Sequence, residues 1–290
     1  MIPNAFDYHA PKTLKKALSL LKAHGDDAKV LAGGHSLIPL MKFRFADPTV
    51  VIDLGRVGGL SRIRVSYDGT VYIGALCTHD AIESSRRLKS KCPLLPETAA
   101  EIGDVQVRNR GTIGGSLVHA DPAADWPAAI LALNAELDIA GGDGTRTVSA
   151  DGFFVDMLTT DVQPGEILTR IRMPAPPERS GGAYIKMHQS ASGFAIAGVA
   201  AQVTLDGEGN CASVGVGVTG VSPVPYRAGA VEDALRGQRP DETAIQAASE
   251  QAISGVDDFQ EDHHASGDYR AHLARVFTRR ALAKAVERAG

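Results

Sequence analysis

Cysteine, long apolar runs and clusters of basic residues are all scarce in this chain of 290 residues. The three cysteines, Cys77, Cys92 and Cys211, form no C-x-x-C pair, which argues against a disulfide framework or a cysteine-rich metal site. No apolar run approaches the roughly 18–20 residues of a membrane span, and the opening MIPNAFDYHAPKT does not resemble a signal peptide. The formal charge is −4 and no Lys/Arg cluster stands out, so the sequence gives no sign of a basic surface that binds nucleic acid. We therefore expect a cytoplasmic protein with no membrane span and no nucleic-acid partner.

Several common site motifs are also missing. There is no P-loop consensus, and neither Ser36 nor Ser116 sits in the G-x-S-x-G elbow of a hydrolase. Residues 215–220, GVGVTG, do match G-x-G-x-x-G. A dinucleotide fingerprint must open a helix, however, whereas here Pro223 and Pro225 follow at once and valine alternates with glycine. We therefore interpret this run as a closely packed strand.

What the chain does contain is the glycine-rich stretch AGGHSLIPLMKFR, residues 32–44, directly after a short apolar run typical of a buried strand. Gly33 and Gly34 can take positive φ and let the backbone approach a ligand closely. Ser36 is a candidate N-cap for the helix that follows. A glycine turn at a helix N-terminus exposes free N–H groups, so this stretch predicts a phosphate site.

A second stretch, GTIGGSLVHADPAAD at residues 111–125, repeats the combination of glycines, hydroxyls and a helix that starts with proline. Two such loops in one chain suggest a ligand with two phosphates. We interpret Asp121 and Asp125 as helix caps, and a metal site formed by both of them with His119 is the alternative. For His35, contact with the ligand and simple exposure to solvent are equally open.

No paired carboxylates, Cys–His pair or Schiff-base lysine stands out as catalytic machinery, and Asp262-His263-His264 fits a solvated loop. We therefore predict neither a catalytic side chain nor a metal site. A protein that carries a redox cofactor has this appearance, because the cofactor supplies the chemistry.

The pattern of elements indicates an α+β chain. Its clearest candidate linker is PAPPERSGG, residues 174–182, which suggests two domains with a boundary near Pro177. The predicted strands are 28–31, 49–54, 62–66, 71–75, 135–140, 146–148, 166–173, 184–189, 194–205 and 211–219. The predicted helices are 14–25, a short one after Ser36, 78–90, 94–107, one that includes 128–135, 228–235, 241–253 and 269–288.

The stretches AGGHSLIPLMKFR and QVRNRGTIGGSLVHADPAADWPA together resemble the FAD-binding medium subunit of the molybdenum hydroxylases, the group of carbon monoxide dehydrogenase and xanthine dehydrogenase. The similarity runs from the opening IPNAFDYHAPKTLKKAL through GEILTRIRMP to the C-terminal hairpin and helices. It implies a two-subdomain FAD-binding fold of the vanillyl-alcohol oxidase type over residues 1–177, with subdomains of about 1–55 and 56–177. A small α+β C-terminal domain, 178–290, would follow.

The resemblance also implies which residues bind FAD. Asp125 matches the family's aspartate near the ribose and ribityl hydroxyls, and Lys186 matches a lysine near the flavin. Ile102 and Leu168 match apolar positions beside the flavin or adenine. The residues that would surround the pyrophosphate are Ala32, Gly33, Gly34, His35 and Ser36 in the first loop and Thr112, Ile113, Gly114, Gly115 and Ser116 in the second. Two sets of main-chain N–H donors could then neutralise the diphosphate without a cation.

Three residues depart from the family pattern. Ser116 stands where many relatives carry Asn, His119 is bulkier than the residues expected there, and Phe194 stands where some relatives place Tyr beside the flavin ring. These differences bear on redox tuning and on the electron acceptor rather than on FAD binding.

By resemblance, this chain is an electron-transfer subunit. Substrate would be oxidised at a molybdenum cofactor on a large subunit, and electrons would pass through 2Fe–2S clusters on a small subunit to the FAD of this chain. A quinone, NAD or dioxygen would be the final acceptor. Two alternatives remain: a free-standing FAD-dependent oxidoreductase of the same fold that acts on a small substrate, and a non-redox nucleotide-binding or assembly protein.

Overall fold

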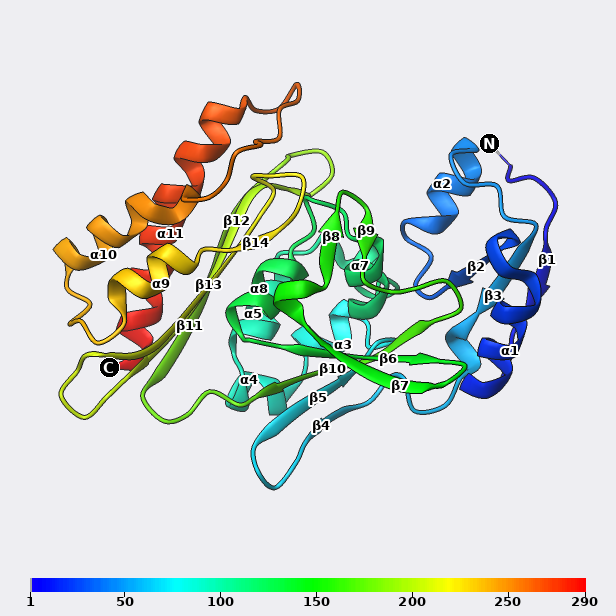
Figure 1. Ribbon diagram of the computed structural model, residues 1–290, viewed down its shortest axis with the longest axis horizontal. Helices are drawn as coiled ribbons and strands as arrows, with labels where there is room; N and C mark the ends of the chain where they lie inside the picture. Colours follow the sequence, from blue (N-terminus) through cyan, green and yellow to red (C-terminus); the bar gives the residue numbers. More distant parts are fainter. Residues whose placement is uncertain (1) are drawn as a thin grey trace.

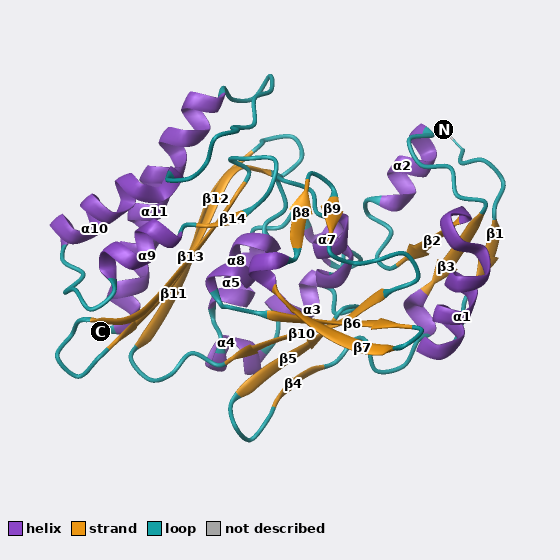
Figure 2. Ribbon diagram, viewed as in Figure 1, coloured by secondary structure: helices purple, strands orange, loops and turns teal. Residues whose placement is uncertain are grey.

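The structure is a computed structural model that describes residues 2–290 of the chain. Its elements form three units that follow one another along the long axis of the molecule (Figure 1). Each unit combines one main sheet with helices (Figure 2), so the predicted α+β class is confirmed. Within residues 2–290, no helix is long and apolar enough to cross a membrane.

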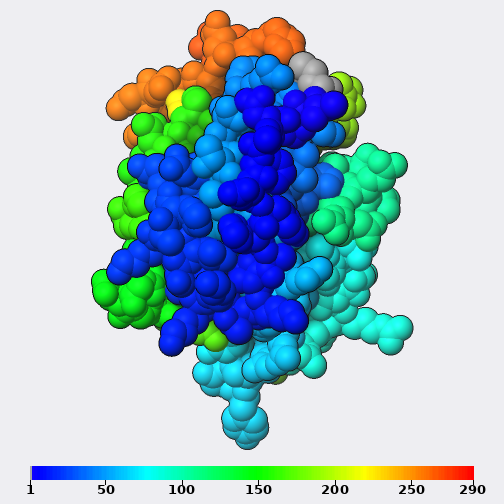
Figure 3. Space-filling view, turned by 90° about the vertical axis from the view of Figure 1, so that its right-hand side faces the viewer, coloured from blue at the N-terminus to red at the C-terminus, as the bar shows by residue number. Residues whose placement is uncertain are grey.

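The N-terminal unit is a parallel three-stranded sheet in the order β1-β3-β2 with helices beside it. It forms one end of the molecule, seen from outside in Figure 3. Thr13 caps the first helix by accepting a hydrogen bond from the N–H of Lys16, and Gly25 ends it at φ +52°. The elements are β1 (Asp7–His9), α1 (Leu14–His24), η1 (Gly25–Asp27), β2 (Ala28–Leu31), α2 (Leu37–Phe43), β3 (Val50–Asp53) and η2 (Leu54–Arg56).

The central unit is built on an antiparallel five-stranded sheet in the order β4-β5-β10-β6-β7. Short helices lie between this sheet and the C-terminal unit (Figure 1). Its strands are β4 (Ile63–Val65), β5 (Thr70–Gly74), β6 (Glu136–Gly141), β7 (Gly144–Ser149) and β10 (Ile167–Pro174), with a small hairpin of β8 (Phe154–Asp156) and β9 (Thr159–Thr160). Its helices are α3 (His79–Glu83), α4 (Arg86–Lys91), α5 (Leu94–Ala100), α6 (Val105–Arg108), α7 (Ile113–His119), α8 (Trp126–Ala132) and η3 (Ala150–Gly152).

The C-terminal unit is an antiparallel sheet in the order β11-β12-β13-β14, with helices on its outer face and α8 of the central unit on the other. Gly215 and Gly217 lie in β13, where a Cβ on either residue would overlap a carbonyl oxygen of α8. The GVGVTG run is therefore a closely packed strand, as predicted. The elements are β11 (Ser180–His188), β12 (Ala195–Leu205), β13 (Cys211–Thr219), β14 (Tyr226–Arg227), α9 (Gly229–Leu235), α10 (Glu242–Ser249), η4 (Glu250–Ile253) and α11 (Gly267–Ala289).

Several predicted elements differ from the structure. The predicted helix 78–90 is split into α3 and α4, because Ser85 takes an extended backbone and caps the second helix through the N–H of Leu88. The predicted helix 94–107 is broken into α5 and α6, because Gly103 takes φ +49° and Asp104 caps a new helix through the N–H of Val107. The predicted linker 174–182 is shorter, since β10 continues to Pro174 and β11 begins at Ser180. The domain boundary near residue 177 stays a prediction.

Candidate functional site: a cavity between two glycine loops

The first glycine loop joins β2 to α2 and presents unused main-chain donors. Within residues 2–290, the N–H groups of Gly33, Gly34, His35 and Ser36 have no hydrogen-bond partner. The imidazole Nδ1 of His35 lies 3.2 Å from the carbonyl oxygen of Gly33, to which it can donate, and this contact tightens the turn. Ser36 occupies the N-cap position of α2, but its hydroxyl caps no N–H group, contrary to expectation. The loop therefore offers several free donors in a row, the arrangement that binds anions.

The second glycine loop is arranged differently. Thr112 caps α7 by accepting a hydrogen bond from the N–H of Gly115 at 3.1 Å. The N–H groups of Ile113 and Gly114 donate to the carbonyl oxygens of Cys77 and Ala75, at 3.0 and 2.9 Å. Most N–H groups of the second loop are therefore already paired within the central unit, unlike those of the first loop, so the second set of donors expected from the sequence is not free.

Close packing, rather than unusual φ, explains most of the loop glycines. Only Gly34 has a positive φ, +76°. A Cβ on Gly33 would overlap the carbonyl oxygen of Arg110 in the approach to the second loop, and a Cβ on Gly114 would lie 2.5 Å from the Cβ of Ala75. The two loops therefore touch each other, although almost eighty residues separate them in the sequence.

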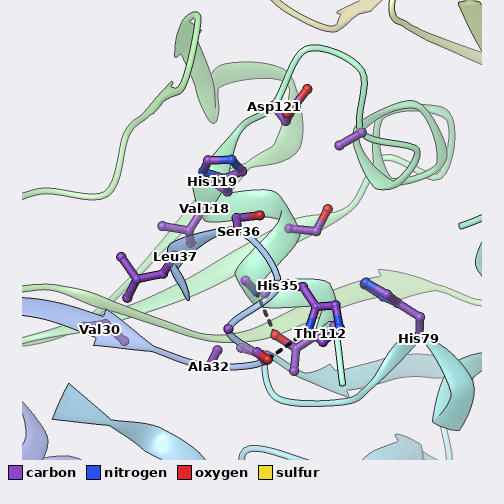
Figure 4. A pocket seen from close by; sticks show the side chains of 18 of the residues that line it. Val30, Ala32, His35, Ser36, Leu37, His79, Thr112, Val118, His119 and Asp121 are labelled. Atoms are coloured by element: carbon purple, nitrogen blue, oxygen red, sulfur yellow. Dashed lines mark hydrogen bonds between the residues drawn. The ribbon is translucent and has the colours of Figure 1, made fainter. Parts of the chain in front are cut away.

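A cavity of about 540 Å³ lies between the N-terminal and central units, with both glycine loops in its wall (Figure 4). Two predicted site residues are set apart from it: the Ile113 side chain is fully buried in the apolar core, and Lys186 lies behind Asp125. The predicted residues that do line the cavity are Ala32, Gly33, Gly34, His35, Ser36, Ile102, Thr112, Gly114, Gly115, Ser116, Asp125 and Leu168.

Asp125 is the centre of a buried polar cluster at this cavity. Its Oδ1 accepts a hydrogen bond from the Tyr184 hydroxyl at 2.6 Å, and Lys186 Nζ lies 2.8 Å from Oδ1 and 3.0 Å from Oδ2. Lys186 also donates to the carbonyl oxygen of Glu101. Burial raises the pKa of Asp125 to about 6, and the positive charge of Lys186 limits this rise.

The predicted capping roles of the two aspartates are therefore wrong in part. Asp125 precedes α8, but its carboxylate caps no N–H group of that helix. Asp121 accepts a hydrogen bond from the N–H of Ala123 at 2.9 Å and forms a turn there, while the helix begins only at Trp126. In the part of the chain that the structure describes, no group of three or more His, Cys, Asp or Glu side chains is placed to hold a metal ion.

His79 is a cavity residue that the sequence reasoning missed. It follows Thr78, whose hydroxyl caps α3, and its Nδ1 accepts a hydrogen bond from the Trp126 indole at 3.0 Å. Figure 4 shows its imidazole pointing toward the loops that carry Thr112 and His35. No local signal marks this residue, because its partner Trp126 lies 47 positions away.

The rim of the cavity is partly apolar. Val118, Leu158 and Phe194 line the cavity and are 36%, 53% and 42% exposed. Leu158 comes from the turn between β8 and β9, and Phe194 from the loop before β12. Of these residues, only Phe194 was singled out from the sequence.

Known families and proteins match this arrangement over nearly the whole chain. A family described as the FAD binding domain in molybdopterin dehydrogenase matches residues 4–176, and the CO dehydrogenase flavoprotein C-terminal domain matches residues 182–285. The carbon monoxide dehydrogenase medium chain of Hydrogenophaga pseudoflava is 41% identical over 283 residues, which are 97% of each chain. The 6-hydroxypseudooxynicotine dehydrogenase complex subunit alpha of Paenarthrobacter nicotinovorans is 39% identical over 289 residues, 100% of this chain and 97% of that one.

A solved structure agrees with the same grouping. Carbon monoxide dehydrogenase from Hydrogenophaga pseudoflava, in a form that lacks the Mo-pyranopterin moiety of its molybdenum cofactor, superposes with a TM-score of 0.95. The match has 42% sequence identity and covers 99% of each chain. The fold and the site thus define an FAD-binding oxidoreductase subunit. The chain belongs to the family of FAD-binding medium subunits of molybdenum hydroxylases, and its cofactor is FAD.

Proposed function

We propose that the FAD pyrophosphate lies against the first glycine loop, within reach of the second. The observation that carries this proposal is the row of unpaired N–H groups at Gly33, Gly34, His35 and Ser36. A diphosphate would accept hydrogen bonds from such donors. The Ser36 hydroxyl in the first loop and the hydroxyls of Thr112 and Ser116 in the second could add further donors. The roles that the family resemblance implies for the other FAD-binding residues belong to the same proposal.

Asp125 and Lys186 would act together in this arrangement. The Asp125 carboxylate has acceptor capacity beyond its bonds to Tyr184 and Lys186, so it could also accept a hydrogen bond from a sugar or ribityl hydroxyl. Lys186 would stabilise the charged form of that carboxylate from behind the cavity wall. Ile102 and Leu168 would offer apolar surface to a ring of the cofactor. Bound FAD supplies the redox chemistry, while the chain binds it, orients it and shields it from water.

We further propose that the chain is the electron-transfer subunit of a molybdenum-containing hydroxylase or dehydrogenase in the cytoplasm. Electrons would arrive from 2Fe–2S clusters on a small subunit, after oxidation of substrate on a large subunit that binds the molybdenum cofactor. A quinone, NAD or dioxygen would then accept them. Two facts support this: relatives are named as medium chains or subunits of dehydrogenase complexes, and three cysteines are fewer than the four ligands of a usual 2Fe–2S cluster.

Purification of the tagged chain from the organism that encodes it would test the assembly. The expected result is co-purification of a large and a small subunit, with flavin bands in the visible spectrum and with molybdenum and iron by elemental analysis. A lone yellow chain that oxidises a small substrate would overturn the proposal in favour of a free-standing oxidoreductase. The location of FAD is tested separately by titrating the purified apo-chain with FAD, with variants of the first loop described below.

A further inference from the structure

A buried histidine faces the proposed FAD site from beside the second glycine loop. His79 is only 4% exposed, yet it lines the cavity. Two contacts fix its backbone beside the second loop: Thr78 forms a β-bridge with Thr112, and the N–H of His79 donates to the carbonyl oxygen of Gly111 at 3.0 Å. The imidazole is therefore held in place next to the residues that begin the second loop.

Trp126 determines which ring nitrogen of His79 carries the proton. An indole N–H can only donate a hydrogen bond, so Nδ1 of His79, 3.0 Å away, must accept it. In a neutral imidazole the proton then sits on Nε2. Burial, with smaller effects from His35 and Arg108, lowers the pKa of His79 to about 4, so the ring is neutral at physiological pH.

The Nε2–H group is left without a protein partner. Within residues 2–290, Nε2 of His79 makes no hydrogen bond, and it keeps some contact with solvent. It therefore opens on the cavity. Gly111 helps to keep this space free, because a Cβ there would lie 2.6 Å from Nε2. A fixed, largely desolvated donor that faces a ligand cavity is suited to a ligand acceptor.

We propose that His79 is a ligand-binding residue that donates a hydrogen bond from Nε2 to an acceptor oxygen or nitrogen of bound FAD. Trp126 is the positioning residue, because it holds the tautomer that makes this donation possible. This inference rests on the proposed placement of FAD in the cavity. The acceptor is either a pyrophosphate oxygen or a polar atom of the flavin ring, and both kinds of acceptor suit an imidazole N–H.

Three variants separate the hydrogen bond from packing. His79→Phe keeps an aromatic ring but removes the donor, so we expect the Kd for FAD to rise roughly tenfold, the effect of one hydrogen bond. His79→Gln retains an N–H and should recover most of that loss. Trp126→Phe leaves the imidazole in place but frees its tautomer, so it should weaken FAD binding by a smaller factor. FAD binding to His79→Phe with unchanged affinity would overturn the proposal.

A spectroscopic measurement on the unmutated chain tests the same point without relying on any variant to fold. In the ¹⁵N spectrum of histidine-labelled protein, His79 should show a protonated Nε2 and an unprotonated Nδ1, and the Nε2–H proton should shift downfield when FAD is added. Observation of the Nδ1–H tautomer, or of no shift on FAD binding, would refute the proposal. Titration with ADP identifies the acceptor: an equal loss of ADP affinity in His79→Phe indicates a phosphate oxygen, and an unchanged ADP affinity indicates the flavin ring.

Failure of this inference can be told apart from failure of the proposed FAD site. If FAD lies elsewhere, substitution of Ser36 in the first loop and of His79 should both leave the Kd unchanged. If FAD lies in the cavity but His79 only packs there, Ser36→Ala should weaken binding while His79→Phe retains it. Urea unfolding of each apo-variant checks that a change in Kd does not come from loss of the fold.

Discussion

The ammonium group of Lys186 lies 2.8 Å from Oδ1 of Asp125, and the two side chains are 0% and 4% exposed. Asp125 stands at the start of α8 in the central unit, whereas Lys186 belongs to β11 of the C-terminal sheet. The pair therefore connects two units directly beneath the cavity wall. In a site with so little solvent, each charge depends on the other for stabilisation.

Loss of the ion pair between Asp125 and Lys186 should lower the stability of the fold far more than loss of a surface ion pair. Lys186→Met would leave Asp125 buried without its cation, and we expect the free energy of unfolding to fall by roughly 3–5 kcal/mol. The matched control is Lys284→Met, which breaks the pair between Glu97 and a lysine whose side chain is 40% exposed and should cost about 1 kcal/mol or less. Urea unfolding of the apo-chain at pH 7 measures both. Similar losses in the two variants would show that Lys186 is not specially required.

The titration of Asp125 should leave a signature in the pH dependence of stability. Because burial raises its pKa to about 6, the folded chain binds more protons than the unfolded chain between about pH 4 and 6. This carboxyl group therefore makes the folded state more stable as the pH falls from 7 to 5, by roughly 1 kcal/mol. The wild type minus Asp125→Asn difference in unfolding free energy isolates this contribution from other carboxylates. A difference that shrinks on acidification would contradict the raised pKa.

Local sequence patterns predicted the elements and the glycine loops well, because those features depend on neighbouring residues. The run of glycines and hydroxyls at 32–36 marked a turn at the end of a strand, and Thr13 and Thr78 mark helix starts that the structure confirms. Short strands such as β1 and β14 were missed because two or three residues carry no hydrophobic period. Their stability comes from main-chain pairing, of β1 with the distant β3 and of β14 with β13.

The chemistry of the cavity was harder to predict, since it depends on contacts between residues far apart in the chain. Asp125 looks like a helix cap in the sequence, and only the fold brings Lys186 and Tyr184 to it. The donors of the second loop looked free for the same reason, although the carbonyl oxygens of Ala75 and Cys77 take up two of them. Spacing could indicate a phosphate-binding turn but not which of its N–H groups stay unpaired.

Removal of the side-chain hydroxyl should affect stability differently at Thr112 and at Ser36. The Thr112 hydroxyl caps α7, so Thr112→Val should lower the unfolding free energy by about 1 kcal/mol as well as weaken FAD binding. The Ser36 hydroxyl caps nothing, so Ser36→Ala should change stability by less than about 0.5 kcal/mol and still raise the Kd for FAD several-fold, roughly the effect of one lost hydrogen bond. Fluorescence titration with FAD and urea unfolding separate the two effects. An unchanged Kd for Ser36→Ala would argue against a ligand at the first loop.

Close packing at the two glycine loops should make both Gly33 and Gly114 sensitive to a single added methyl group. A Cβ at Gly33 would overlap the Arg110 carbonyl, and a Cβ at Gly114 would press on Ala75, so we expect each Ala variant to lose roughly 1–3 kcal/mol of stability. FAD affinity should fall with it, because Gly33→Ala pushes the first loop away from the second and Gly114→Ala pushes the second loop away from Ala75, and both loops line the cavity.

The matched control for these substitutions is Gly229→Ala, at the first residue of α9, where an added Cβ meets nothing within 4 Å. It should leave FAD affinity unchanged and stability unchanged or slightly higher, because alanine restricts the unfolded chain more than glycine does. Apo-chain unfolding and FAD titration should therefore separate Gly33→Ala and Gly114→Ala from this control on both measurements. If Gly33→Ala or Gly114→Ala behaved like Gly229→Ala in both measurements, the corresponding loop would not be tightly packed at the cavity. The proposal that both loops bind the diphosphate would then lack structural support.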